Sequence, residues 1–160
     1  MQNKIYFFIS LILLCVLVMS CDRDSNLNER YILSTVDHAM IEAYIDEHVT
    51  DEGEDEQVLS VHEVLGSDQG AGKIYLWVMA EGYMTKANRI VKTSGLSQPV
   101  LLKVSDKSGD LEIIEHASPR DGNDYPKDIK KMFPDFIIDK FDNVEEKLRE
   151  ELEKKFRELE

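Results

Sequence analysis

Histidine side chains are the groups in this chain best suited to acid–base catalysis or metal binding. Their spacing predicts neither, because no two stand in a His-x-x-x-His pair and both cysteines lie within the first 21 residues. His62 and His116 are expected on separate strands and could meet across a sheet, but the glutamates beside them would point to the opposite face. We therefore assign no catalytic residue, no metal ligand and no cofactor. The four histidines are His38, His48, His62 and His116.

Cys21 is the residue whose position predicts a covalent modification. It follows an apolar run, residues 5–19, that opens after Lys4 and closes on the small residue Ser20. These features indicate a secretory signal peptide rather than a membrane span, which needs ~20 apolar residues. The segment Val18-Met19-Ser20-Cys21 resembles the lipobox of bacterial lipoproteins, in which the cysteine thiol is acylated and becomes the new N-terminus. The resemblance implies cleavage after Ser20 and a lipid anchor on Cys21.

The charge balance narrows the class of partners. The chain has 19 basic and 32 acidic side chains, and removal of residues 1–20 takes Lys4 and leaves a net charge of −14. Phosphate backbones and anionic headgroups repel such a domain, so neither nucleic acid nor polybasic adhesion to a membrane is expected. The lipid must then hold the protein at the membrane, which requires more than one acyl chain. We predict a location on the outer face of the cell membrane.

The rest of the chain divides into a tether, one domain and a terminal helix. Residues 21–28 are polar and aperiodic, which is typical of a tether. Residues 29–134 carry helical and strand patterns and are expected to form one domain, because ~140 mature residues suffice for a single core. Cleavage and lipidation leave no free thiol in this domain, so its stability must come from apolar packing.

A first helix is predicted from Glu29 to about Glu47. Its apolar residues recur at spacings of three and four and form a stripe that should face a sheet. The stripe consists of Ile32, Val36, Ala39, Met40 and Ala43. Ile41 and Ile45 fall on the far side of the helix, where a second neighbouring element would be needed to cover them.

The acidic run 51–56 follows the first helix and predicts a solvated loop. A calcium loop is the alternative, although the Asp-x-Asp-x-Asp-Gly order is missing.

Strand patterns follow the acidic run. Arg89–Thr93 is an additional short segment that would form an edge strand. Connections such as Gly66–Gly72 are as long as hairpin loops, so successive strands should pair as an antiparallel meander. The four main segments are Val58–Leu65, Lys73–Met84, Pro99–Ser105 and Leu111–Ala117.

The chain closes with a turn at residues 118–123, a short helix at Pro126–Met132 and an amphipathic helix over residues 135–160. The apolar stripe of this last helix should dock on its own domain or on a second copy, and its distal half, Leu152–Leu159, could overhang and pair with another molecule. The stripe consists of Ile137, Phe141, Val144, Leu148, Leu152, Phe156 and Leu159.

Together the helix and strand patterns predict an α+β fold: an antiparallel sheet of four or five strands packed on the first helix, cystatin-like or nuclear-transport-factor-like in outline.

The predicted strand Lys73–Met84 is apolar on both faces, which an antiparallel sheet with one solvated face would not require. One face carries Tyr75, Trp77 and Tyr83. Two interpretations stay open for these aromatic side chains. The C-terminal helix could cover them as core, or they could form a face for a ligand or a protein partner, where Tyr and Trp are common.

Five stretches of the chain resemble a known family. They are Val61–Gly66, Lys73–Val78, Ser94–Val100, Pro119–Tyr125 and Asp128–Pro134. Together they resemble an uncharacterised domain of Gram-positive bacterial lipoproteins. Similar domains form outward-facing appendages of membrane metallopeptidases that resemble β-lactam sensors. The resemblance covers about half of the chain and brings neither catalytic residues nor a zinc-binding peptidase part.

These observations favour a lipid-anchored binding or accessory module outside the cytoplasmic membrane, without catalytic activity. Its partners would be the membrane, reached through the lipid, and a protein or a second copy bound through residues 135–160. The alternative is a small extracytoplasmic hydrolase that uses a histidine or a carboxylate on the sheet.

Overall fold

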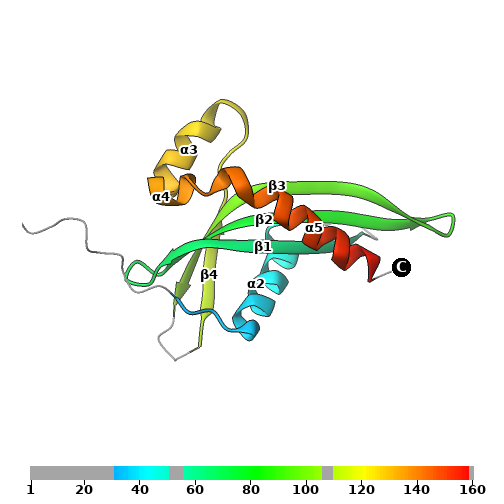
Figure 1. Ribbon diagram of the computed structural model, residues 1–160, viewed down its shortest axis with the longest axis horizontal. Helices are drawn as coiled ribbons and strands as arrows, with labels where there is room; N and C mark the ends of the chain where they lie inside the picture. Colours follow the sequence, from blue (N-terminus) through cyan, green and yellow to red (C-terminus); the bar gives the residue numbers. More distant parts are fainter. Residues whose placement is uncertain (1–30, 51–55, 106–109, 159–160) are drawn as a thin grey trace, which may run out of the picture.

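The computed structural model describes residues 31–50, 56–105 and 110–158. Ser20, Cys21, the predicted tether and residues 51–55 of the acidic run, predicted as a solvated loop with a calcium loop as the alternative, lie outside the described residues. A helix, four strands and a helical C-terminal segment follow one another along the described chain (Figure 1). The elements are α2 (Thr35–His48), β1 (Gln57–Asp68), β2 (Lys73–Lys86), β3 (Arg89–Ser105), β4 (Glu112–Ala117), η1 (Gly122–Asp124), α3 (Tyr125–Met132), α4 (Asp135–Ile138), η2 (Phe141–Asn143) and α5 (Val144–Arg157).

The four strands form one antiparallel meander in the order β1-β2-β3-β4, which confirms the predicted α+β fold. The β1–β2 connection turns at Gly72, whose φ is +61°. The β2–β3 connection turns at Ala87 and Asn88, with φ of +50° and +58°. Two adjacent residues in the left-handed region are typical of the type I′ turn, whose twist matches that of paired strands.

β2 and β3 extend beyond the other two strands as a two-stranded arm. Pairing of β1 with β2 stops at Gln57 opposite Tyr83, and β4 pairs only with Leu101 to Ser105 of β3. Pairing of β2 with β3 nevertheless continues to the tip, and Figure 1 shows the arm reaching past α2 and α5. Arg89–Thr93 is therefore the first part of β3, where we had predicted a separate edge strand.

Helix α2 packs on one face of the sheet through Ile41 and Ile45, both 0% exposed, and not through the predicted stripe. Ile32 precedes the helix and is 97% exposed, and Ala39 and Ala43 face solvent. The prediction was wrong because two isoleucines four residues apart bury far more apolar area than two alanines. They meet a layer of aliphatic side chains, namely Ile74, Leu76, Val78, Val100, Leu102 and Val104.

The C-terminal segment covers the other face of the sheet (Figure 1). Phe133 lies against Tyr75 with ring centroids 5.9 Å apart, and Phe141 meets Trp77 edge-on at 4.9 Å. Edge-to-face aromatic pairs of this kind add to the free energy gained by burial alone. The other buried residues of this second core include Val61, Leu65, Met79, Leu101, Ile129, Ile137, Val144, Leu148 and Leu152.

The predicted C-terminal helix is present as three consecutive pieces, α4, η2 and α5. Its distal half also packs on the sheet. Leu152 is 2% exposed, and Phe156 stacks on Tyr83 with ring centroids 4.6 Å apart. Leu159 lies outside the described residues. The distal half is thus held by its own domain at least as far as Phe156.

A bidentate ion pair fixes the turn that leads from the sheet into α3. Arg120 donates from Nε to Asp128 Oδ2 at 2.7 Å and from Nη2 to Oδ1 at 2.9 Å, and its backbone N–H donates to the same carboxylate. These hydrogen bonds hold the pKa of Asp128 well below its usual range. Both residues belong to stretches that carry the family resemblance, so those motifs have a structural role here.

Candidate functional site

The aromatic face that the sequence singled out is core. Tyr75, Trp77 and Tyr83 are 4%, 7% and 7% exposed. Two of them also use their polar atoms in hydrogen bonds: Trp77 Nε1 donates to Ser97 Oγ at 3.0 Å, and the Tyr83 hydroxyl donates to Glu81 Oε2 at 2.5 Å. The C-terminal segment is the cover, so of the two interpretations the structure favours core over an open ligand face.

The main polar cluster lies on the other side of the sheet, where α2 crosses β1. His38 of α2 and His62 of β1 stack with ring centroids 5.1 Å apart. His38 Nδ1 lies 2.9 Å from His62 Nε2, a hydrogen-bond distance at which one nitrogen must donate and the other accept. The side chain of His62 is only 2% exposed. We call this cluster the histidine junction; its members are His38, Glu42, Asp46, Ser60, His62 and Lys155.

Lys155 ties the histidine junction to α5. Its ammonium donates to Glu42 Oε2 of α2 at 2.8 Å and to the backbone carbonyl of Ser60 on β1 at 2.9 Å. One cation therefore connects three elements at the outer edge of the sheet. The other oxygen of Glu42 lies 3.9 Å from His62 Nδ1. That separation is an electrostatic contact and too long for a hydrogen bond.

Three polar atoms in the histidine junction are buried without a hydrogen-bond partner. They are Asp46 Oδ1, Ser60 Oγ and His62 Nδ1. Burial raises the pKa of Asp46, because a charged carboxylate loses solvation there, and this outweighs the opposite influence of the nearby Ser60 hydroxyl and Lys155 ammonium. The Ser60 hydroxyl lies close enough to influence Asp46 but does not meet hydrogen-bond geometry with it. Unsatisfied groups of this kind cost free energy, which offsets part of the stabilisation from the hydrogen bonds that Lys155 and the two histidines make.

The electrostatic environment keeps His62 neutral at physiological pH. Burial is the largest cause and lowers its pKa to about 4, and the electrostatic influence of His38 and of Lys155 acts in the same direction. Glu42 opposes them without cancelling them. A neutral imidazole can accept a hydrogen bond from His38 or donate one to it, so the pair can share a single proton.

The chemistry open to the histidine junction is limited by access and by ligand number. Glu42 and Lys155 are each one-third exposed, but the imidazole of His62 is sealed beneath them. In the part of the chain that the structure describes, no three histidine, cysteine, aspartate or glutamate side chains are placed to hold a metal ion. The geometry fits a structural joint between α2, β1 and α5 better than a substrate site.

His116 takes part in a separate contact. Its Nδ1 lies 3.1 Å from the Tyr44 hydroxyl, and the Tyr44 ring also packs against His48 at 4.5 Å. Burial lowers the pKa of His116, and the nearby His48 lowers it further. His62 and His116 stand on the two opposite edge strands, β1 and β4, so they do not meet across the sheet.

A sequence signal for the histidine junction was present but was overlooked. His38, Glu42 and Asp46 are spaced by four residues, which places them along one side of a helix. Ser60 and His62 are spaced by two, which places them on one face of a strand. The two patterns together point to a polar contact between helix and strand, whereas each histidine taken alone predicts a structural residue.

Comparisons with known proteins leave the family open. No family model matches the chain, and no curated protein or solved structure matches it. Among the described residues, no helix is long and apolar enough to cross a membrane. The resemblance to lipoprotein domains therefore stays a prediction from sequence motifs.

Proposed function

We propose that the protein is a lipid-anchored binding or accessory module on the outer face of the cell membrane, without catalytic activity. The observation that carries this proposal is the position of Cys21, directly after the apolar run 5–19 and the small residue Ser20. An acylated cysteine with two or more chains gives stable attachment, which one chain alone does not.

The position of Tyr31, where the described chain enters the domain, indicates which end of the sheet would lie nearer the anchor. The backbone N–H of Tyr31 donates to Ser67 Oγ at 2.9 Å, next to the β1–β2 hairpin. The β2–β3 arm points from the opposite end of the same strands (Figure 1). A domain tethered through residues before Tyr31 would thus be held near one end of the sheet and would present the arm at the other.

The rival proposal is a small hydrolase, and the histidine junction is the observation that favours it. Two imidazoles at hydrogen-bond distance can move a proton. Against it stands the burial of His62, whose side chain is 2% exposed and therefore shielded from any substrate. A hydrolase screen separates the two proposals: activity that disappears in His62→Ala but persists in His116→Ala would establish the enzyme.

The anchor is tested with the two native cysteines. Cys21→Ala should abolish incorporation of a fatty-acid probe and either release the protein from membranes or leave its precursor uncleaved. Cys15→Ala is the matched control, because this cysteine lies inside the apolar run, and it should leave labelling and fractionation unchanged. Labelling that survives in Cys21→Ala would end the lipoprotein proposal.

A further inference from the structure

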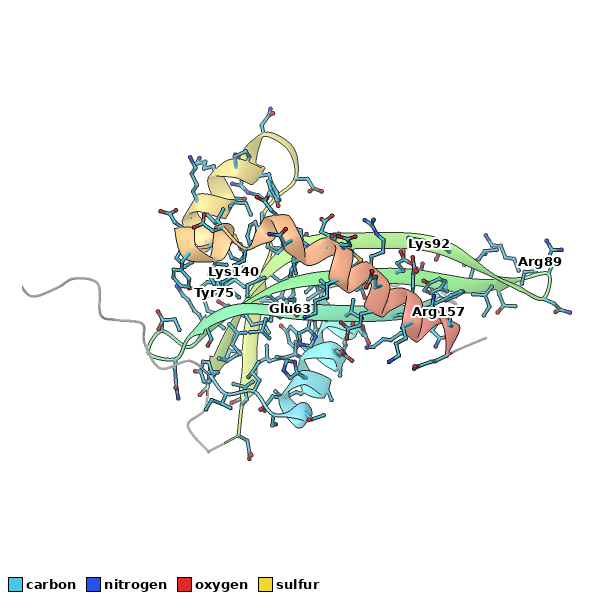
Figure 2. All side chains as sticks on the ribbon, in the orientation of Figure 1. Glu63, Tyr75, Arg89, Lys92, Lys140 and Arg157 are labelled. Carbon is cyan, nitrogen blue, oxygen red and sulfur yellow. The ribbon has the colours of Figure 1, made fainter. Side chains whose placement is uncertain are left out.

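The β2–β3 arm differs in charge from the rest of the molecule. Residues 84–98 contain three basic side chains and no acidic one, in a chain whose net charge is −13. Lys92 pairs with Glu81 at the base of the arm, whereas no acidic side chain that the structure describes forms an ion pair with Lys86 or Arg89. Figure 2 shows Arg89 at the outer end of the arm. The arm is therefore a projecting basic ribbon on an acidic protein.

Among the described residues, no strand pairs with the outer edge of β3 along the arm. Its residues from Arg89 to Val100 pair with β2 on one side, while β4 reaches only Leu101 to Ser105 on the other. Ile90 lies in this stretch and is 41% exposed. An unpaired edge offers backbone donors and acceptors to another strand, which is a common basis for strand addition.

β4 provides a second edge without a partner strand in the described part of the chain, and its charge is opposite to that of the arm. It is the last strand of the sheet, its side chains Glu112 and Glu115 are acidic, and Ile114 between them is 62% exposed. Ile114 projects because the pairing with β3 slips between Val104 and Lys103, which leaves one extra residue on β4. Glu115 pairs with Lys103, and no ion pair involves Glu112 among the described residues.

We propose that the arm of one copy binds the β4 edge of a second copy. In an antiparallel alignment, Arg89 lies opposite Glu115, Lys92 opposite Glu112, and Ile90 opposite Ile114. Each cross-pair then joins one charge that forms no ion pair with the described residues, Arg89 or Glu112, to one that has an intramolecular partner. A parallel alignment would place Ile90 opposite Ile113, which is already packed on the α2 side of the sheet, and would leave Ile114 uncovered.

Charge also argues against the simpler pairing of like edges. Two arms laid edge to edge would bring Arg89 and Lys92 close to their own counterparts, and like charges across an interface are repelled. Two β4 edges would bring glutamates together in the same way. The arm-to-β4 contact is heterologous, so its repetition links copies head to tail.

The contact is small and is expected to be weak in dilute solution. It goes beyond the proposed function and depends on it in one respect: anchoring in a membrane concentrates the copies and orients them, which raises their effective concentration. If Cys15 is removed with the signal peptide and Cys21 is acylated, the mature chain has no native thiol that could form a disulfide with an introduced cysteine. Disulfide trapping in membranes is therefore the natural test.

The experiment co-expresses two differently tagged full-length copies, one with Ile90→Cys and one with Ile114→Cys, and oxidises the isolated membranes. The mixed disulfide should form at least ~10-fold faster than with Phe136→Cys, a somewhat more exposed apolar position on α4, in place of Ile90→Cys. The chain without an introduced cysteine reports any link through Cys15 or Cys21.

Charge reversal decides whether the contact is the one proposed. Arg89→Glu with Lys92→Glu in the first copy should reduce trapping to the Phe136→Cys level, and Glu112→Lys with Glu115→Lys in the second copy should restore it. The proposal would be overturned if the mixed disulfide formed no faster than with the Phe136→Cys control, or if its rate of formation did not change with either charge reversal. Fractionation of the same cells tests the membrane anchor separately. If the anchor is absent but the contact between copies is real, the purified chain should still form the mixed disulfide at high protein concentration.

Discussion

The two faces of the sheet are covered in different ways. The face beneath α3, α4 and α5 is apolar and aromatic, and its buried polar atoms have partners, as the hydrogen bond from Trp77 Nε1 to Ser97 Oγ illustrates. The face beneath α2 has an equally dry aliphatic centre around Ile41 and Ile45, but its margin at β1 contains the histidine junction with three unsatisfied polar atoms. Both faces are stabilised mainly by apolar burial, and the α2 face adds a buried histidine that titrates.

This difference separates two contributions to stability. Apolar burial does not change with pH, so the α5 face should contribute equally in mild acid and at neutrality. The α2 face contains His62, which is neutral in the folded state and must be protonated at a cost when the pH falls. The comparison predicts that acid weakens the attachment of α2 before that of α5.

The largest expected effect is on the α5 face. Leu148 is 0% exposed in the centre of this core, and Leu148→Ala should lower the free energy of unfolding by ~2–5 kcal/mol. Because no titrating group is removed, urea unfolding should give the same loss at pH 5 and pH 8. Lys154→Ala on the exposed side of α5 is the control and should stay within ~0.5 kcal/mol. A loss below ~1 kcal/mol for Leu148→Ala would show that α5 does not dock in this way.

The second prediction concerns the pH dependence of the α2 face. The folded pKa of His62 is about 4, below the usual value of 6.5, so the unfolded chain binds more protons between these values. Its contribution is complete above pH 6.5 and is lost as the pH falls toward 4, by up to ~3 kcal/mol. In His62→Gln, the free energy of unfolding should depend less steeply on pH between about 6.5 and 4.

Val61→Ala is the matched control for that measurement. Val61 is the neighbouring residue on β1, is 0% exposed and does not titrate. Its replacement should shift the stability curve downward by a similar amount at every pH. Equal slopes for His62→Gln and the unsubstituted chain would mean that the histidine junction is not sensitive to protons.

Sequence patterns predicted those elements well whose structure depends mainly on neighbouring residues in the chain. The β-branched and aromatic strand segments, the hairpin around Gly72 and the helix at Pro126–Met132 all occur as expected, because turn chemistry and a period of two are local properties. The face of α2 was mispredicted, since both candidate stripes fit a helical period and only the volume of Ile41 and Ile45 decides between them.

The candidate site was harder to predict because it depends on contacts between distant segments. His38 and His62 are 24 residues apart, and Lys155 comes from a different helix more than 90 residues later. Nothing in the local pattern requires α5 to cross the edge of β1. The sequence predicted that the strand Lys73–Met84 is apolar on both faces and left the C-terminal helix, a partner or a ligand as covers for its aromatic face. The contacts of Phe133 with Tyr75 and of Phe141 with Trp77 identify the C-terminal segment as the cover.

The third prediction tests the sheet that both faces share. Gly72 has φ +61°, and a Cβ at this position would lie 2.7 Å from the carbonyl oxygen of Val104. Gly72→Ala should therefore lower the free energy of unfolding by ~1–3 kcal/mol. Hydrogen exchange should accelerate in α2 and α5 alike. Gly95→Ala is the control, because its nearest contacts are ordinary at 3.6 Å and its cost should be under ~0.5 kcal/mol.

The smallest expected effect isolates the α2 face. Ser34 caps α2: its Oγ accepts from the Asp37 backbone N–H at 3.2 Å, and the Asp37 carboxylate accepts from the Ser34 backbone N–H at 2.7 Å. Ser34→Ala removes one half of this reciprocal cap and should cost ~1 kcal/mol. The helix frays at its first turn, which carries His38. Hydrogen exchange should therefore accelerate in α2 but not in α5, and Thr35→Ala, one residue later and exposed, should change neither. Equal acceleration in both helices would show that the two faces open as one unit, and the distinction between a pH-sensitive face and an insensitive one would lose its physical basis.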